Sequence, residues 1–128
     1  MKKILCVDDE PGILKVVEVV FQLEGFEVHT ALSGYEMFEK LHSLTPDIIL
    51  LDVLMPGMDG FEVCQKLKAE KETEQIPVVM FSVRCDIDDV ERATQAGACR
   101  HIPKPVGMDN LVQQIKEVLK ETEEKAWE

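Results

Sequence analysis

The hydrophobic and polar positions along this chain follow two alternating patterns. Short apolar runs of strand length cover residues 4–7, 48–51, 78–81 and 99–102, and a run with alternating apolar positions covers 26–31. After each run, apolar residues recur every three or four positions, as on one face of an amphipathic helix. The pattern therefore predicts five strands, each followed by a helix.

Local signals place the starts of these helices. Pro11 suits the first turn of the first helix, and Ser33 with Glu36 forms a capping-box pattern for the second. Asp59 is the expected N-cap of the third helix and Asp86 that of the fourth. Because strands joined by crossover helices form a parallel sheet covered on both faces, the sequence predicts a doubly wound α/β fold of the (βα)5 type.

Length and continuity indicate one domain. The 128 residues suit a single core, and no low-complexity linker divides them. We expect a folded domain over residues 1–122 and a charged C-terminal tail over 123–128. Glu27 and His29 interrupt the apolar character of the second strand, so this strand is expected at an edge of the sheet.

Composition narrows the classes of function. The formal net charge of −11 argues against direct nucleic acid binding, which requires an excess of Lys and Arg. The cysteines show no CxxC spacing and are interpreted as small buried hydrophobes: Cys6, Cys64, Cys85 and Cys99. The N-terminus lacks the apolar region of a signal peptide, and no apolar run reaches the ~18 residues of a membrane span. A cytoplasmic protein without membrane contact is expected.

Polar side chains follow four of the five predicted strands. Asp8 and Asp9 follow the first strand, Asp52 the third, Ser82 the fourth and Lys104 the fifth. Each of them alone has an ordinary explanation as a helix cap, a turn residue or a solvated charge. In a parallel sheet, however, the carboxyl ends of the strands meet at one edge, where open α/β sheets place their sites. We therefore expect these side chains to converge.

The combination suits phosphoryl transfer. Clustered carboxylates repel one another and call for a cation, and oxygen ligands with few carboxylates favour Mg²⁺. Asp52 would attack phosphorus in line, while Lys104 and the metal neutralise the phosphoryl oxygens and Ser82 offers a hydroxyl. Transition-metal ligation is not expected, because the histidines are scattered: His29, His42 and His101.

At these positions the chain resembles the receiver domain of two-component response regulators, of the kind found in chemotaxis regulators. The matching segments lie within about residues 2–122 and read Val7-Asp8-Asp9-Glu10, Asp52, Met55-Pro56-Gly57-Met58-Asp59-Gly60, Ser82 and Lys104-Pro105. The resemblance implies a flavodoxin-like fold with a five-stranded sheet of order 2-1-3-4-5. It also implies a cis peptide bond between Lys104 and Pro105.

The resemblance further implies a role for each site residue. Asp52 would be the phosphoacceptor for a histidine kinase or a phosphotransfer protein. Asp9, Asp52 and the backbone carbonyl of Leu54 would bind Mg²⁺ directly, with Asp8 acting through water. Lys104 would hold the phosphoryl oxygens. The protein would be regulatory rather than an enzyme, with self-phosphorylation from small phosphodonors and slow autodephosphorylation.

The implied output is a switch. Ser82 would move toward the phosphoryl group and alter the face formed by the fourth helix, the fifth strand and the fifth helix, where a downstream protein, an output domain or a second copy would bind. The fourth helix has a thin apolar stripe of Ile87, Val90 and Ala93, as expected of a mobile element.

Three positions depart from the family pattern. His101 stands where Phe or Tyr is usual at the switch, which suggests either pH-sensitive output or an exposed histidine with no switching role. Leu54 cannot orient an attacking water, and Arg84 is placed to shield or contact the phosphoryl group. We therefore expect slow self-dephosphorylation.

Other functions are weighed against the receiver interpretation. A Mg²⁺-dependent aspartyl-phosphate phosphohydrolase would carry a DxD motif after the first strand, whereas this chain has Asp8-Asp9-Glu10. A flavodoxin-like cofactor carrier would need a phosphate loop there. A phosphate-independent receiver scaffold would not need an intact acidic site.

Overall fold

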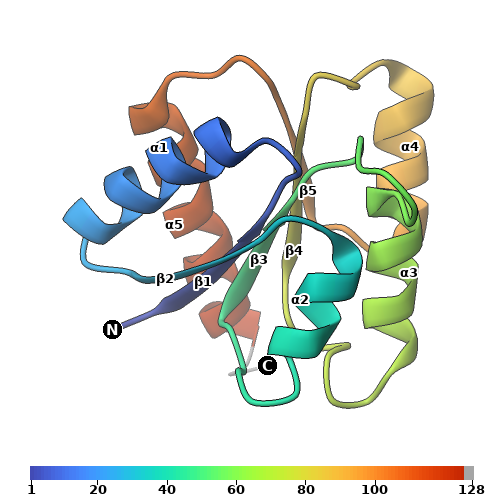
Figure 1. Ribbon diagram of the computed structural model, residues 1–128, viewed down its shortest axis with the longest axis horizontal. Helices are drawn as coiled ribbons and strands as arrows, with labels where there is room; N and C mark the ends of the chain where they lie inside the picture. Colours follow the sequence, from blue (N-terminus) through green and yellow to red (C-terminus); the bar gives the residue numbers. More distant parts are fainter. Residues whose placement is uncertain (126–128) are drawn as a thin grey trace.

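The computed structural model describes residues 1–125 of the chain. Five strands and five helices alternate along it (Figure 1). They are β1 (Lys3–Val7), α1 (Pro11–Leu23), β2 (Glu27–Ala31), α2 (Gly34–Lys40), β3 (Ile48–Leu51), α3 (Gly60–Ala69), β4 (Val78–Ser82), α4 (Ile87–Ala96), β5 (Arg100–Pro103) and α5 (Met108–Lys125). All strand pairs are parallel, and the sheet order is β2-β1-β3-β4-β5. The α/β doubly wound fold is therefore confirmed, with β2 at an edge.

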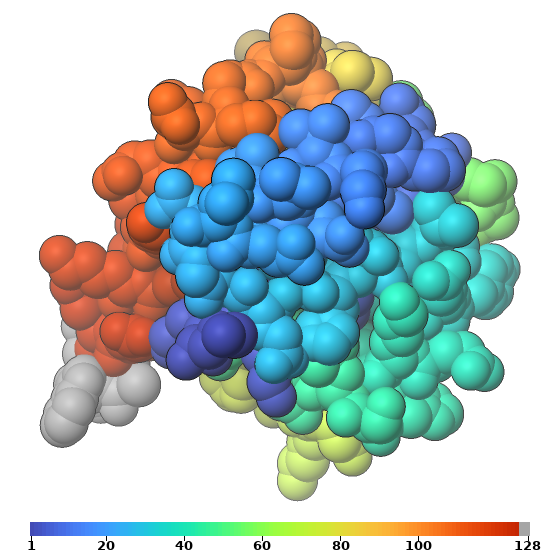
Figure 2. Space-filling view, turned by 60° about the vertical axis from the view of Figure 1, so that its left-hand side comes forward, coloured from blue at the N-terminus to red at the C-terminus, as the bar shows by residue number. Residues whose placement is uncertain are grey.

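The sheet separates two hydrophobic cores because neighbouring strand residues point to opposite faces. Leu5 and Ile49 belong to the core under α2, α3 and α4, whereas Ile4 and Ile48 belong to the core under α1 and α5. Figure 2 shows the α1–α5 side from outside, with α1 in blue, α5 in orange and red on one flank and α2 in teal on the other. Both faces of the sheet are thus covered.

The caps of the helices largely follow the sequence signals. Pro11 occupies the first turn of α1, and Asp59 accepts a hydrogen bond from the backbone N–H of Glu62 at the start of α3. Asp86 begins α4 with a full capping box. At α2 the Ser33 hydroxyl accepts the N–H of Glu36, but the Glu36 carboxylate accepts the N–H of Leu32 instead of Ser33. The predicted capping box at α2 is therefore only half formed.

Several other expectations are corrected. The stripe predicted for α4 is only partly buried: Ala93 is 1% exposed and packs against the core beside Ala96, whereas Ile87 is 78% and Val90 40% exposed. Cys6 and Cys64 are buried as expected, whereas two cysteines are exposed, Cys85 and Cys99.

The C-terminal helix extends past the expected domain boundary at residue 122. α5 continues to Lys125, and Glu123 pairs with Lys2 at 2.8 Å. Residues 126–128 of the expected charged tail lie outside the described residues. Between residues 1 and 125, no helix has both the length and the apolar character needed to cross a membrane.

Candidate phosphorylation site

The carboxyl ends of the strands bring the expected side chains to one edge of the sheet. Asp8 follows β1, Asp52 follows β3, Ser82 ends β4 and Lys104 follows β5. Backbone hydrogen bonds hold the ends in register: the N–H of Asp52 donates to Val7 at 3.0 Å, and that of Lys104 donates to Ser82 at 2.9 Å. The predicted meeting of these strand ends at one edge of the sheet is therefore confirmed.

Lys104 joins two of the carboxylates. Its ammonium lies 2.6 Å from Oδ2 of Asp8 and 3.5 Å from Oδ2 of Asp52. Burial lowers the pKa of this ammonium, but the hydrogen bond to Asp8 and the charge of Asp52 outweigh burial and raise the pKa above its usual range. Lys104 therefore stays protonated at neutral pH. Its peptide bond to Pro105 is cis.

Asp52 is a buried carboxylate whose surroundings disfavour its charged form. Only 4% of it is exposed. Burial raises the pKa of Asp52, and the negative charge of Asp8 raises it further. Lys104, the N–H of Leu54 at 3.3 Å from Oδ1 and the hydroxyl of Ser82 offset part of this effect. The site therefore carries more negative charge than Lys104 neutralises.

An acidic cluster next to Asp52 can hold a metal ion. Asp8, Asp9 and Glu10 each offer a carboxylate oxygen, and these oxygens lie within 4.8 Å of one another. An all-oxygen donor set beside an incompletely neutralised Asp52 fits a hard divalent cation such as Mg²⁺. Glu10 is not among the site residues predicted from the sequence, although its position directly after Asp9 is a signal for it.

The loop between β3 and α3 must pass very close to the Asp52 backbone. A Cβ on Gly60 would lie 2.3 Å from the carbonyl oxygen of Asp52 and 2.7 Å from Cα of Val53. The N–H of Gly60 donates to the carbonyl of Val53 at 2.9 Å. A residue with a side chain at position 60 would therefore collide with the backbone of Asp52 and Val53.

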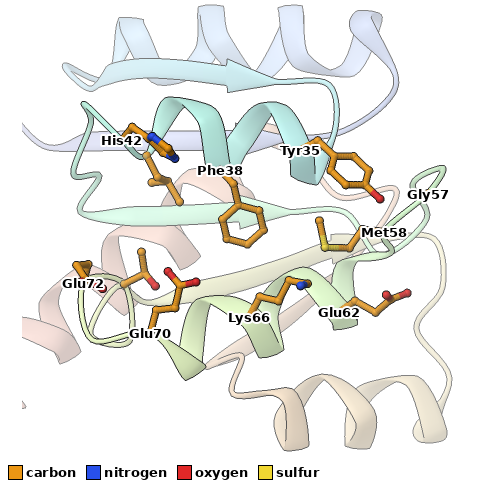
Figure 3. A pocket seen from close by; sticks show the side chains of 11 residues that line it. Tyr35, Phe38, His42, Gly57, Met58, Glu62, Lys66, Glu70 and Glu72 are labelled. Carbon is orange, nitrogen blue, oxygen red and sulfur yellow. The ribbon is translucent and has the colours of Figure 1, made fainter.

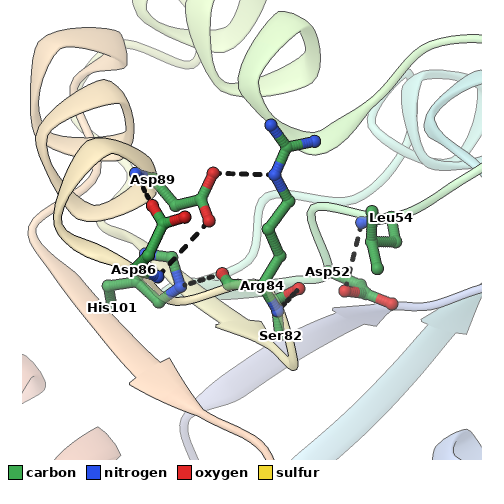
Figure 4. A network of polar contacts seen from close by, with 7 residues as sticks. All are labelled: Asp52, Leu54, Ser82, Arg84, Asp86, Asp89 and His101. Atoms are coloured by element: carbon green, nitrogen blue, oxygen red, sulfur yellow. Dashed lines mark hydrogen bonds and ion pairs between the residues drawn. The ribbon is translucent and has the colours of Figure 1, made fainter.

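A chain of polar contacts leads from Ser82 to α4 (Figure 4). The Ser82 hydroxyl accepts the N–H of Arg84 at 3.2 Å, and Nε of Arg84 donates to Asp89 at 2.7 Å. Nε2 of His101 lies 2.9 Å from the carbonyl oxygen of Arg84, while its buried Nδ1 has no partner among residues 1–125. Burial raises the pKa of Asp89, but Arg84 and the N–H of Asp86 outweigh burial and lower the pKa below its usual range.

Arg84 is therefore engaged with α4 in this structure. Its guanidinium also lies 5.8 Å from the centre of the Phe61 ring. The expectation that Arg84 shields or contacts a phosphoryl group at Asp52 stays a prediction. Leu54 is 45% exposed. Together with Asp9 and Arg84 it lines a depression of about 430 Å³.

Comparison with known proteins agrees with this geometry. The sequence model of the family described as "Response regulator receiver domain" matches residues 4–116. The chain is 32% identical over 123 residues to the DNA-binding dual master transcriptional regulator RpaA of Synechocystis, covering 96% of this chain and 51% of that protein. It is also 32% identical over 120 residues to the phosphate regulon transcriptional regulatory protein PhoB of Rhizobium meliloti, covering 94% and 53%. The chain thus spans about half the length of these curated relatives.

Solved structures show the same fold. A CheY-like response regulator receiver domain protein from Methanospirillum hungatei superposes with a TM-score of 0.91 at 30% identity, covering 98% of each chain. The chemotaxis protein CheY4 of Vibrio cholerae superposes with a TM-score of 0.88 at 30% identity, covering 92% of this chain and 98% of that one. These similarities do not favour the phosphohydrolase or scaffold interpretations. Because the family match runs through nearly all the described secondary structure and includes the whole carboxylate–lysine edge, this chain belongs to the response regulator receiver domains of two-component signalling.

Proposed function

We propose that Asp52 accepts a phosphoryl group from the phosphohistidine of a histidine kinase or a phosphotransfer protein. The observation that carries this proposal is the pair of buried carboxylates, Asp8 and Asp52, which share the single ammonium of Lys104 at the sheet edge. A carboxylate whose charge is only partly compensated is ready to react with an electrophilic phosphorus.

The phosphoryl transfer replaces one bond to phosphorus by another. An oxygen of Asp52 attacks phosphorus, the phosphorus–nitrogen bond of the donor breaks, and its electron pair returns to the imidazole. The product is an aspartyl phosphate. Hydrolysis returns the protein to its unphosphorylated form: water attacks the same phosphorus, the bond to Asp52 breaks, and the carboxylate and inorganic phosphate are released. The protein is thus a regulatory phosphoacceptor, and small phosphodonors such as acetyl phosphate would serve the same reaction.

The residues around Asp52 would bind the metal ion and the phosphoryl oxygens. Asp9, Asp52 and the carbonyl of Leu54 would hold Mg²⁺ directly and Asp8 through water; of these, Asp8 and Asp9 belong to the acidic cluster at this edge. When bound, the metal supplies positive charge to the phosphoryl oxygens. Lys104 would turn from its present carboxylate partners to those oxygens.

Ser82 would transmit the modification. Its hydroxyl would donate a hydrogen bond to the phosphoryl group. The N–H of Arg84 now donates to that hydroxyl, and the Arg84 side chain is paired with Asp89 of α4. A shift of Ser82 would therefore reach the α4–β5–α5 face, where Ile87 and Val90 are already exposed.

We propose that this face binds a downstream protein, an output domain or a second copy of the chain. Direct nucleic acid binding by the domain itself is not part of the proposal, given the net charge of −11. The proposed setting is cytoplasmic, because free thiols such as that of Cys85 suit a reducing compartment.

The switch is tested by adding beryllium fluoride with Mg²⁺ to the ¹⁵N-labelled protein. Amide shifts are expected at Ser82, at Arg84 and along α4 and β5 in the wild type, and none are expected in Asp52→Asn. Equal shifts in both proteins, or no shifts in the wild type, would contradict the proposal.

A further inference from the structure

A groove separate from the phosphorylation edge runs between α2 and α3. It measures about 680 Å³ and reaches from the β3–α3 loop at Gly57 to the turn after α3 at Thr73 (Figure 3). Its lining includes none of the carboxylates around Lys104. A groove of this volume lies within the usual range for binding sites.

The floor of the groove is apolar. Phe38 of α2 and Leu41, the C-cap of that helix, are partly buried and pack against the core, and Met58 is 6% exposed. At one end the exposed ring of Tyr35 stands beside Gly57, where an added Cβ would lie 3.1 Å from the ring. Figure 3 shows the Phe38 ring between α2 and α3, facing the side chains of α3. Apolar side chains of a ligand would find matching surface here.

The rim of the groove is acidic. Glu62, Glu70 and Glu72 all line it and are exposed. Within residues 1–125, none of their carboxylates has an ion-pair or hydrogen-bond partner. The one ammonium in the lining is that of Lys66, so three carboxylates stand against one ammonium. The rim therefore complements a cationic ligand.

A hydrogen bond holds one end of the groove in place. The buried hydroxyl of Thr73 donates to the carbonyl of Leu67 at 2.6 Å and fixes the turn that carries Glu70 and Glu72 to the end of α3. A preformed site lowers the ordering cost of binding. α3 has 10 residues, which at the helical rise corresponds to about 15 Å. This length matches two to three turns of a helix laid alongside.

We propose that the α2–α3 groove is a docking site for a basic amphipathic helix of a partner protein. Apolar side chains spaced three or four residues apart enter over Phe38, Leu41 and Met58. Lys or Arg side chains beside them meet Glu70 and the other rim carboxylates. This is the helix-in-groove mode of recognition with charge complementarity at the rim.

The test uses the ¹⁵N-labelled chain of 128 residues and three synthetic peptides of equal length. One is an amphipathic Leu/Lys helix, one has the same composition with the leucines scattered around the helix, and one is an amphipathic Leu/Glu helix. The first is expected to bind with amide shifts at Phe38, Met58 and Thr73, and about tenfold more tightly than the scattered peptide. The Leu/Glu peptide is expected not to bind.

Matched variants separate the groove from general attraction to an acidic protein. Glu70→Gln is expected to lower the affinity for the amphipathic Leu/Lys peptide by about two- to fivefold at low salt. Glu91→Gln removes an exposed carboxylate of α4 that is likewise unpaired within residues 1–125, and should leave the affinity unchanged. Equal binding of the scattered peptide, equal effects of the two variants, or shifts confined to another face would overturn the proposal.

Discussion

Lys104→Met tests how far the ammonium of Lys104 offsets the charges of Asp8 and Asp52 at the edge of the sheet. The substitution keeps most of the side-chain volume but removes the ammonium that lies 2.6 Å from Asp8 and 3.5 Å from Asp52. Both carboxylates are only 4% exposed, so water replaces the lost charge poorly. Breaking a buried ion pair from one side costs about 3–5 kcal/mol. The neighbouring Asp9 is exposed, so water reaches this part of the sheet edge. The loss of stability is therefore expected at the lower end of this range.

A loss of about 3 kcal/mol corresponds to a fall in Tm of roughly 10–15 °C for a domain of this size. The measurement is urea and thermal unfolding at pH 7 in metal-free buffer. Lys116→Met is the control, because Lys116 makes an exposed ion pair with Glu24 at 2.9 Å, and such pairs contribute about 1 kcal/mol or less. Mg²⁺ should restore more stability to Lys104→Met than to the wild type, since the ammonium no longer competes. Equal losses for the two variants would refute the reasoning.

Four further substitutions give separate expectations. Asp52→Asn should raise Tm in metal-free buffer at pH 7, since the pKa of Asp52 is raised in the folded protein by burial and by Asp8. A raised pKa means that the contribution of Asp52 to stability is complete below its unfolded pKa of about 3.9 and is lost as pH rises through the folded pKa. The gain in Asp52→Asn should therefore shrink on acidification, and a gain that is constant with pH would contradict this. Gly60→Ala should lower stability by about 1–3 kcal/mol, because its Cβ would lie 2.3 Å from the Asp52 carbonyl oxygen; an unchanged unfolding midpoint would count against the contact. Leu54→Asn should lose its phosphoryl group several-fold faster than the wild type in an acyl-phosphate decay assay, and a faster wild type would reverse that assignment. His101→Phe removes the ring nitrogen that lies 2.9 Å from the Arg84 carbonyl oxygen, so the amide signals around Arg84 should shift in the variant; unchanged signals there would remove a contact role for His101.

The strand ends could be predicted from the sequence because their position follows from topology alone. Once the runs before Asp8, Asp52 and Lys104 are taken as parallel strands, their carboxyl ends must share one edge. The partner that each group selects could not be predicted in the same way. The pairing of Lys104 with Asp8 depends on the reach and rotamer of a long side chain across residues 96 positions apart.

Helical spacing also left the faces of α4 undecided. Ile87 and Val90 have the spacing of a buried stripe, yet the helix packs through the small side chains of Ala93 and Ala96, which permit a close approach to the core. The ion pair of Arg84 with Asp89 joins a loop residue to a helix, so it could not be predicted from helical spacing. Local periodicity predicts which elements form, whereas their packing decides which residues they expose.

The most direct test of the central claim is intact mass after treatment with acetyl phosphate. With Mg²⁺, the wild type should gain the mass of one phosphoryl group, and the label should map to Asp52. Without Mg²⁺, and in Asp52→Asn with Mg²⁺, the gain should be absent. A wild type that stays unlabelled with Mg²⁺ and an active donor, or an Asp52→Asn protein that labels equally well, would contradict the account.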